Sequence, residues 1–278
     1  MNPIVQAAAQ LLRIRRGWVQ LGAALATNSY FPTFLKRVPC AGLNCYSCPA
    51  AAFACPIGGL QHFVAARQVP LYLGAVLGLT GLITGRLTCG WLCPFGWLQD
   101  LAYRLPVHKW SPRARLPWLR FVILAVFVLL LPFLTGEQWF SKICPAGTLE
   151  AGIPWVLLSA EVRKQAGWLF AFKVATLALL LGWMTATRRP FCRYFCPLGA
   201  VYALFNPISL LRVTVDSSAC SGCGQCRTIC PVEIDPLTSV NSVECIHCME
   251  CVRACPSGAL FLGRAGRAPQ ATTAELRG

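Results

Sequence analysis

The sequence predicts an all-α membrane domain, a bundle of four transmembrane helices within residues 1–211, followed by a small cysteine-rich α+β domain over residues 212–262. Composition carries the first part of this prediction. Hydrophobic residues make up 56% of the 278 residues and charged residues only 13%, and mean hydropathy is +0.55, as in membrane proteins. Cysteine usage carries the second, because eight of the 17 cysteines lie between residues 220 and 255.

Four apolar segments predict the transmembrane helices, because about 20 mostly apolar residues suffice to cross the hydrocarbon core. They are residues 17–35, 71–85 (extendable to 87), 116–136 and 167–187. The first is interrupted by Asn28, Ser29 and Pro32, and the fourth contains Lys173. The short sequence Ala24-Leu25-Ala26 also resembles a signal-peptide cleavage site, but the apolar run continues past it, so we expect an uncleaved helix.

Basic residues predict the orientation. Under the positive-inside rule, both termini and the 86–116 loop are cytoplasmic and the chain is a multi-pass protein of the bacterial inner membrane. The loop over residues 36–69 fits this rule less well. The net charge of +15 is then explained by orientation and by contact with anionic lipid, and we expect no nucleic-acid partner because no basic face with interleaved aromatic residues remains. The tail, 263–278, is predicted to be disordered. The orienting residues are Arg13, Arg15, Arg16, Arg86, Arg104, Lys109, Arg113, Arg115, Arg188, Arg189 and Arg193.

The C-terminal region contains one cysteine motif written twice. The motif is C-x2-C-x2-C-x3-C-P, and its spacing lets three thiolates bind one 4Fe-4S cube while the fourth cysteine reaches the cube of the other copy. Paired zinc sites or disulfides are the alternatives. The region resembles bacterial-type two-cluster ferredoxins, and the predicted ligand sets are Cys220, Cys223, Cys226 and Cys255 for one cluster and Cys245, Cys248, Cys251 and Cys230 for the other.

A second motif, C-P-x-G, occurs four times in the predicted membrane domain. Proline suits the first position of a helix, so each cysteine is expected at a helix N-cap. There the free backbone N–H groups and the positive helix end favour a thiolate or a thiolate-bound cluster. The four copies begin at Cys55, Cys93, Cys144 and Cys196, and the second and fourth are preceded by Cys89 and Cys192.

The predicted topology sorts these cysteines into two groups of four. Cys89, Cys93, Cys192 and Cys196 follow cytoplasmic helix ends and are expected to share one further iron-sulfur centre, with small apolar core positions or disulfides as the alternative. Cys45, Cys48, Cys55 and Cys144 lie in the opposite loops, where a further centre or disulfides are the two alternatives. Cys40 is left over, as an alternative ligand to Cys45.

These features together resemble the NapH/MauN-type, ferredoxin-like membrane subunits of quinol dehydrogenase systems, whose relatives include the membrane modules of NosR- and CcoG-like proteins. The resemblance rests on the four spans, the two C-x3-C-P elements and the doubled C-terminal motif. It implies electron relay between the membrane quinone pool and partner redox subunits or soluble carriers. An electron-donating maturation factor or metal reductase and a cluster-based membrane regulator are the alternatives.

Other side chains carry weaker signals. A quinol sheds protons as it loses electrons, and His62 and Glu150 are the candidate acceptors on the outer side. His247, between two predicted cluster ligands, is expected to be exposed. Haem is not expected, because the chain has no C-x-x-C-H attachment sequence.

Overall fold

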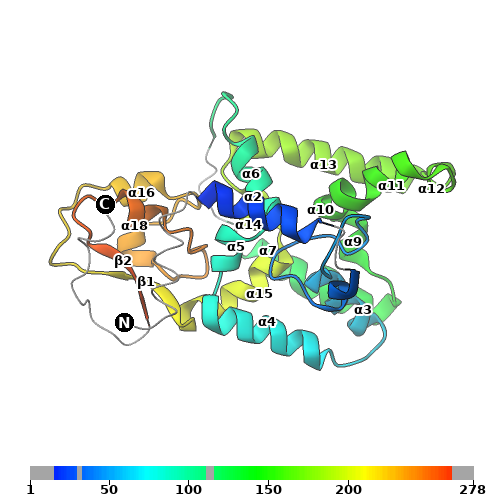
Figure 1. The fold of residues 1–278 in the computed structure, drawn as a ribbon, viewed down its shortest axis with the longest axis horizontal. Helices are drawn as coiled ribbons and strands as arrows, with labels where there is room; N and C mark the ends of the chain where they lie inside the picture. The colour runs from blue at the N-terminus through cyan, green and yellow to red at the C-terminus, as the bar shows by residue number, and fades with distance from the viewer. Residues whose placement is uncertain (1–15, 30–32, 111–115, 265–278) are drawn as a thin grey trace.

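The computed structural model describes residues 16–29, 33–110 and 116–264. Within these residues the fold is mostly helical, with one two-stranded sheet close to the C-terminus. Figure 1 shows a helical body extended along the long axis of the molecule and a smaller C-terminal module at one end of that axis. The predicted tail from residue 265 and the orienting residues Arg13, Arg15, Arg113 and Arg115 lie outside the described residues.

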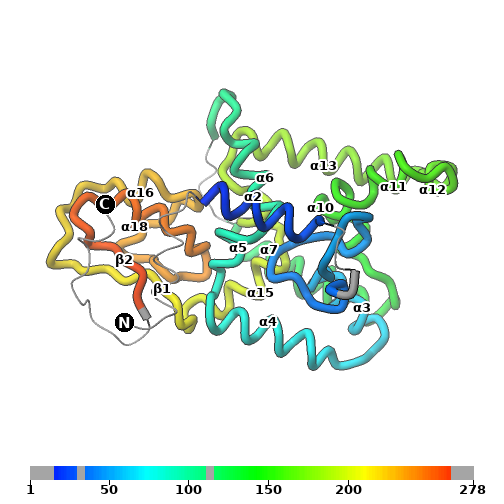
Figure 2. The backbone as a smooth tube through the Cα atoms, viewed as in Figure 1, coloured from blue at the N-terminus to red at the C-terminus, as the bar shows by residue number. Residues whose placement is uncertain are grey.

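The predicted apolar segments correspond to the longest helices. In Figures 1 and 2 the second and the last of these helices run roughly along the long axis at opposite edges of the body, with shorter helices between them. The helix α13 is the only one among the described residues that is both long and apolar enough to span a membrane. The elements are α2 (Arg16–Thr27), α4 (Leu71–Thr84), α7 (Leu119–Ile123) continued by the π-helical η2 (Leu124–Leu130) and by α8 (Leu131–Thr135), and α13 (Trp168–Ala186).

The first helix is shorter than the sequence predicts. The helix α2 ends at Thr27 rather than near residue 35, and a separate 3-10 turn, η1 (Thr33–Arg37), follows. Polar side chains explain the end, because they compete for backbone carbonyls in the last turn. The Thr27 hydroxyl donates to the Ala23 carbonyl at 2.8 Å, and Asn28 Nδ2 donates to the Ala24 carbonyl at 3.0 Å.

Short helices fill the rest of the body. All four C-P-x-G cysteines occupy helix N-caps with proline at the first helical position, as predicted. The remaining elements are α3 (Pro56–Ala65), α5 (Leu87–Trp91), α6 (Pro94–Ala102), α9 (Trp139–Ile143), α10 (Pro145–Gly147), η3 (Thr148–Gly152), α11 (Ile153–Leu158), α12 (Ala160–Lys164), α14 (Pro190–Tyr194), α15 (Pro197–Phe205) and η4 (Asn206–Ile208).

The C-terminal module, residues 211–264, is built from two similar halves. Strand β1 (Leu211–Val215) pairs antiparallel with β2 (Leu260–Arg264), so the first and last segments of the module lie together. Between them lie α16 (Gln225–Ile229), α17 (Pro236–Ser239) and α18 (Glu250–Ala254). Each of α16 and α18 ends at a cysteine that precedes a proline, Cys230 and Cys255.

Arginines join the module to the body. Arg120 is fully buried and pairs with Glu244 at 2.6 Å, and Arg193 pairs with Glu233 at 3.0 Å. Several of the arginines that we interpreted as orienting residues are therefore buried at this junction. They are Arg16, Arg86, Arg189 and Arg193, each at most 8% exposed.

Candidate functional site

Cys89, Cys93, Cys192 and Cys196, called here the inner group, lie together in the body although about a hundred residues separate the two pairs. Each of the four is only 5–7% exposed. Cys196 lies within electrostatic range of the other three thiols, and Cys93 lies within range of Cys89 and Cys192. The structure therefore gathers all four thiols in one buried region of the body.

Polar donors face the sulfur atoms of the inner group. The Gly199 amide donates to Cys196 Sγ at 3.3 Å, and Gln99 Nε2 donates to Cys192 Sγ at 2.9 Å. The Leu43 amide also faces the Cys93 thiol. Donors aimed at sulfur stabilise thiolate ligands and tune the clusters that such ligands hold.

The chemistry of the inner group fits a cluster better than free thiols. Burial raises the pKa of the Cys93 and Cys196 thiols, so the thiolates need a positively charged partner. No disulfide forms among the 17 cysteines, all of which lie in described segments. Among the described residues, no group of three or more His, Cys, Asp or Glu side chains is placed to hold a metal ion. Buried polar atoms without a partner, Arg86 Nε and Thr88 Oγ1, lie in the same segment as Cys89.

Two buried arginines flank the inner group in a reciprocal arrangement. Arg86 Nη2 donates to the Cys192 carbonyl at 3.2 Å, and Arg189 Nη1 donates to the Cys89 carbonyl at 2.9 Å. Each arginine precedes one cysteine pair by three residues and contacts the other pair. We did not predict these contacts, although the repeat R-x2-C-x3-C-P-x-G is present twice, from Arg86 and from Arg189.

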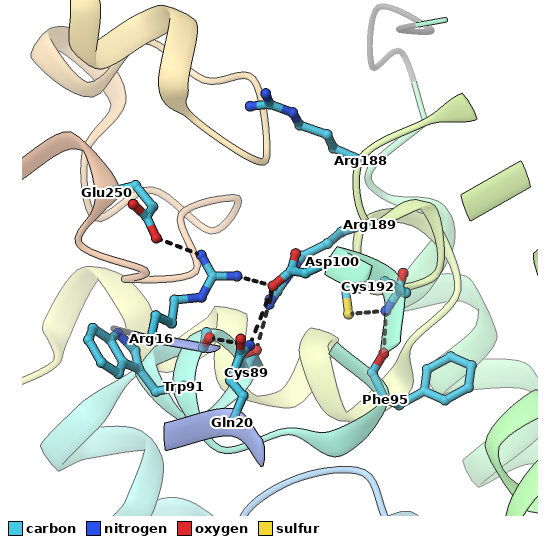
Figure 3. Close-up of polar contacts among 12 residues, drawn as sticks. Arg16, Gln20, Cys89, Trp91, Phe95, Asp100, Arg188, Arg189, Cys192 and Glu250 are labelled. Carbon is cyan, nitrogen blue, oxygen red and sulfur yellow. Dashed lines mark hydrogen bonds and ion pairs between the residues drawn. The ribbon is translucent and has the colours of Figure 1, made fainter. Parts of the chain in front are cut away.

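Asp100 balances one of these charges. It accepts from Arg189 Nε at 2.7 Å and Nη2 at 2.5 Å, and it also pairs with Arg16, so that it lies between the two guanidinium groups (Figure 3). Burial alone would raise the pKa of Asp100, but the two arginines lower it to about 2. Arg16 also pairs with Glu250 of α18 at 3.4 Å, so this network connects the inner group to the C-terminal module.

One cysteine set of the module lies against the inner group. Cys251 is within electrostatic range of Cys230, Cys245 and Cys248, so these four lie together. A Cβ atom added to Gly90, next to Cys89, would lie 2.5 Å from the Ile246 carbonyl oxygen and 3.3 Å from Cys248 Cα. Only glycine permits this close approach of the two backbones.

The other cysteine set of the module lies nearer solvent. Cys226 is buried, Cys220 and Cys255 are half-buried, and Cys223 is exposed. Cys226 and Cys255 pack in the same hydrophobic cluster, between α16 and α18. This set is therefore the one that an external protein can approach most closely.

The outer group, Cys45, Cys48, Cys55 and Cys144, is only partly gathered. Cys55 lies within electrostatic range of Cys45 and Cys144, while Cys48 lies beside Cys45 and its thiol donates to Asn28 Oδ1 at 3.8 Å. Burial raises the pKa of the Cys55 and Cys144 thiols to about 12.

A cavity of about 1030 Å³ opens beside the outer group and is lined by Cys45, Cys55 and Cys144. His62, on α3, is exposed and lines the same cavity. Glu150 accepts from the Cys45 amide at 2.5 Å, and burial raises its pKa to about 7 against the effect of that amide. Glu150 thus lies beside the outer group, and His62 lines the cavity that this group borders.

One prediction on a single residue is wrong, and a second residue, Cys40, is placed without a test of its predicted role. His247 is fully buried rather than exposed, because its ring fits between the Thr84 carbonyl at 3.4 Å and Asn241 Oδ1 at 3.0 Å. Burial lowers the pKa of His247 to about 4. Cys40 is buried, and its Sγ accepts from the Gly42 amide at 3.4 Å.

Comparisons with known proteins identify the family of this chain. A family model described as "4Fe-4S binding domain" matches residues 69–113, 117–160 and 168–213, and a second model with the same description matches residues 213–234 and 238–261. An uncharacterized protein of Methanocaldococcus jannaschii, MJ0749, is 30% identical over 216 residues, which cover 73% of this chain and 76% of that protein. The chain belongs to the ferredoxin-type 4Fe-4S proteins.

Relatives with assigned names support this family. The methylamine utilization ferredoxin-type protein MauN of Methylobacillus flagellatus is 31% identical over 56% of this chain and 52% of its own length. YccM of Escherichia coli, whose name refers to electron transport, is 30% identical over 72% of this chain and 60% of its own length. The chain thus spans about half the length of MauN. No solved structure matches this chain. The protein is an iron-sulfur electron-transport protein of the ferredoxin type.

Proposed function

We propose that this ferredoxin-type protein is embedded in the membrane and relays electrons between the quinol pool and partner redox proteins. The observation that carries the proposal is the convergence of four buried cysteines in the inner group, directly against the Cys230/Cys245/Cys248/Cys251 set of the module. When bound by these cysteines, 4Fe-4S clusters supply one-electron transfer. The protein supplies their position, their insulation from water and their electrostatic surroundings.

The order of the cysteine sets along the molecule supports a relay. The outer group lies beside a large cavity, the inner group lies in the body, and the two module sets follow towards solvent. A hydrocarbon core of about 30 Å is too wide for one electron step, so intermediate sites are needed. We infer that electrons enter at the outer group and leave from the set that contains the exposed Cys223.

Exposed apolar side chains support membrane embedding. Trp168 and Leu179 on α13 are 82% and 77% exposed, and Leu71 on α4 and Leu134 on α8 are 78% and 64% exposed. Water disfavours such faces, whereas lipid accommodates them. We therefore propose that α2, α4, α7–η2–α8 and α13 are four transmembrane segments, with the module and both termini on the cytoplasmic side.

We place quinol oxidation in the cavity beside the outer group. Apolar and aromatic side chains such as Phe140, Trp155 and Phe170 line it, together with the polar Gln61 and His62, which is the mixture that an apolar ligand with polar ends requires. Each quinol gives two electrons to the relay and two protons, for which His62 at the cavity lining and Glu150 beside Cys45 are the acceptors.

Filling this cavity tests the proposal. Ala166 lies on an exposed turn and lines the cavity, so Ala166→Trp should occupy it without disturbing the core. With the purified chain and duroquinol, we expect reduction at least tenfold slower than in the unchanged protein. Reduction by dithionite should not change, because dithionite does not need the cavity.

Ala160→Trp is the matched control, since Ala160 is exposed on the neighbouring α12 and does not line the cavity. It should leave both rates unchanged. Failure of duroquinol to reduce the unchanged protein would reject the quinol link. Equal rates for Ala166→Trp and Ala160→Trp would reject the placement of the quinol in this cavity.

A further inference from the structure

We propose that Arg86 and Arg189 set the reduction potential of the inner group, each acting from one Cys-Pro repeat on the cysteines of the other. This inference rests on the proposed function in one respect, namely that the inner group holds a cluster. The two arginines touch backbone carbonyls of the ligating segments rather than electron donors or acceptors, so they act as positioning and charge-setting residues.

Each arginine side chain fits against a glycine of the opposite repeat. A Cβ atom added to Gly199, in the second repeat, would lie 3.3 Å from Arg86 Nη2, and one added to Gly96, in the first repeat, would lie 3.4 Å from Arg189 Nη1. The glycine of each C-P-x-G motif therefore leaves room for the guanidinium of the other half. Arg189 also holds a left-handed backbone, with φ of 47°, which is unusual for a residue other than glycine.

The charges of the two arginines reach both neighbouring cysteine sets. Arg189 lies within electrostatic range of Cys192 and Cys248, and Arg86 lies within range of Cys192 and Cys245. Both guanidinium groups are at most 1% exposed, so water screens them little. They lie at the junction between the inner group and the Cys230/Cys245/Cys248/Cys251 set, which is the next site in the proposed relay.

Their effect on reduction has a definite sign. A thiolate-bound cluster becomes more negative when it accepts an electron, and net charge and hydrogen bonding are the main determinants of its potential. Buried cations that cannot lose their protons stabilise the reduced form. Removing one of these charges should therefore lower the potential, and removing the carboxylate that balances Arg189 should raise it.

The experiment is a redox titration of the purified full-length protein followed by electron paramagnetic resonance. The signal of the inner group is identified by its loss in Cys93→Ser. We expect Arg86→Met and Arg189→Met each to lower the equilibrium constant for one-electron reduction of the inner centre at least tenfold. This corresponds to a downward shift of its reduction potential by at least about 59 mV. Arg86→Lys and Arg189→Lys keep the charge and should shift it by less than half of that.

Asp100→Asn should shift the reduction potential in the opposite direction. It also tests the inference if a Met variant does not retain the signal. It leaves Arg189 in place without its balancing carboxylate, so the potential should rise. Arg163→Met, on the exposed α12 at the far end of the body, is the control and should cause no shift. Potentials that stay constant, or that fall alike in the Met, Lys and Asn variants, would overturn the inference. Absence of any signal that Cys93→Ser removes would instead reject the inner cluster itself.

Discussion

The inner and outer groups share one local design but differ in their surroundings. In both, a cysteine caps a short helix that begins with proline, and a glycine amide can point at the sulfur, as from Gly199 to Cys196 and from Gly58 to Cys55. The inner group is closed and flanked by two buried arginines. The outer group borders a cavity of about 1030 Å³ and the carboxyl group of Glu150. We infer that the motif supplies the thiol ligands, and that its surroundings decide whether a site passes electrons within the protein or exchanges them with a ligand.

Iron release should show the largest difference between the groups. Treated with ferricyanide and a chelator, the outer group should lose its iron at least ten times faster than the inner group, because the cavity admits both reagents. The time course of released iron, with the signals assigned by Cys55→Ser and Cys93→Ser, measures the two rates. Release from the inner group first, or at the same rate, would contradict the comparison.

Glycine substitutions should show a smaller difference between the two groups, measured as a shift in the reduction potential of the inner group. Gly96→Ala would place Cβ 3.4 Å from Arg189 Nη1 and 3.2 Å from the Cys89 carbonyl oxygen, so the guanidinium must move by a few tenths of an ångström. We expect a shift in the potential of the inner group well below the tenfold effect of losing the charge.

The matched control for this substitution lies in the outer group. In Gly147→Ala the added Cβ atom would make only ordinary van der Waals contacts, 3.6 Å to Cys45 Sγ and 3.8 Å to Cys144 Cβ. Its three nearest atoms include none from an arginine. It should leave the inner potential unchanged. The same redox titration measures both variants, and equal shifts would show that arginine placement does not distinguish the groups.

Local sequence patterns predicted most of the local structure. The helix N-caps followed from Cys-Pro because proline favours the first helical position, and three of the four long helices lie within three residues of the predicted segments. The first helix was predicted too long, because Thr27 and Asn28 bond back to the carbonyls of its last turn.

Features that depend on contacts between distant segments could not be predicted. Arg86 and Arg189 were interpreted as surface charges for membrane orientation, since no single segment shows that each bonds to the cysteine segment of the other repeat. His247 was expected at the surface, but Asn241 and the Thr84 carbonyl enclose it. The cavity likewise depends on segments from η1 to α13 that only the fold brings together.

The central claim is that the two Cys-Pro pairs form one centre. The most direct measurement compares the iron content and electron paramagnetic resonance spectra of Cys93→Ser, Cys196→Ser and the double variant, with Arg163→Met on the exposed α12 as the control. We predict that each single variant loses the same signal and about four iron atoms per chain, as one 4Fe-4S cluster contains, and that the double variant loses no more. Different signals lost in the two single variants, or losses that add in the double variant, would contradict the claim.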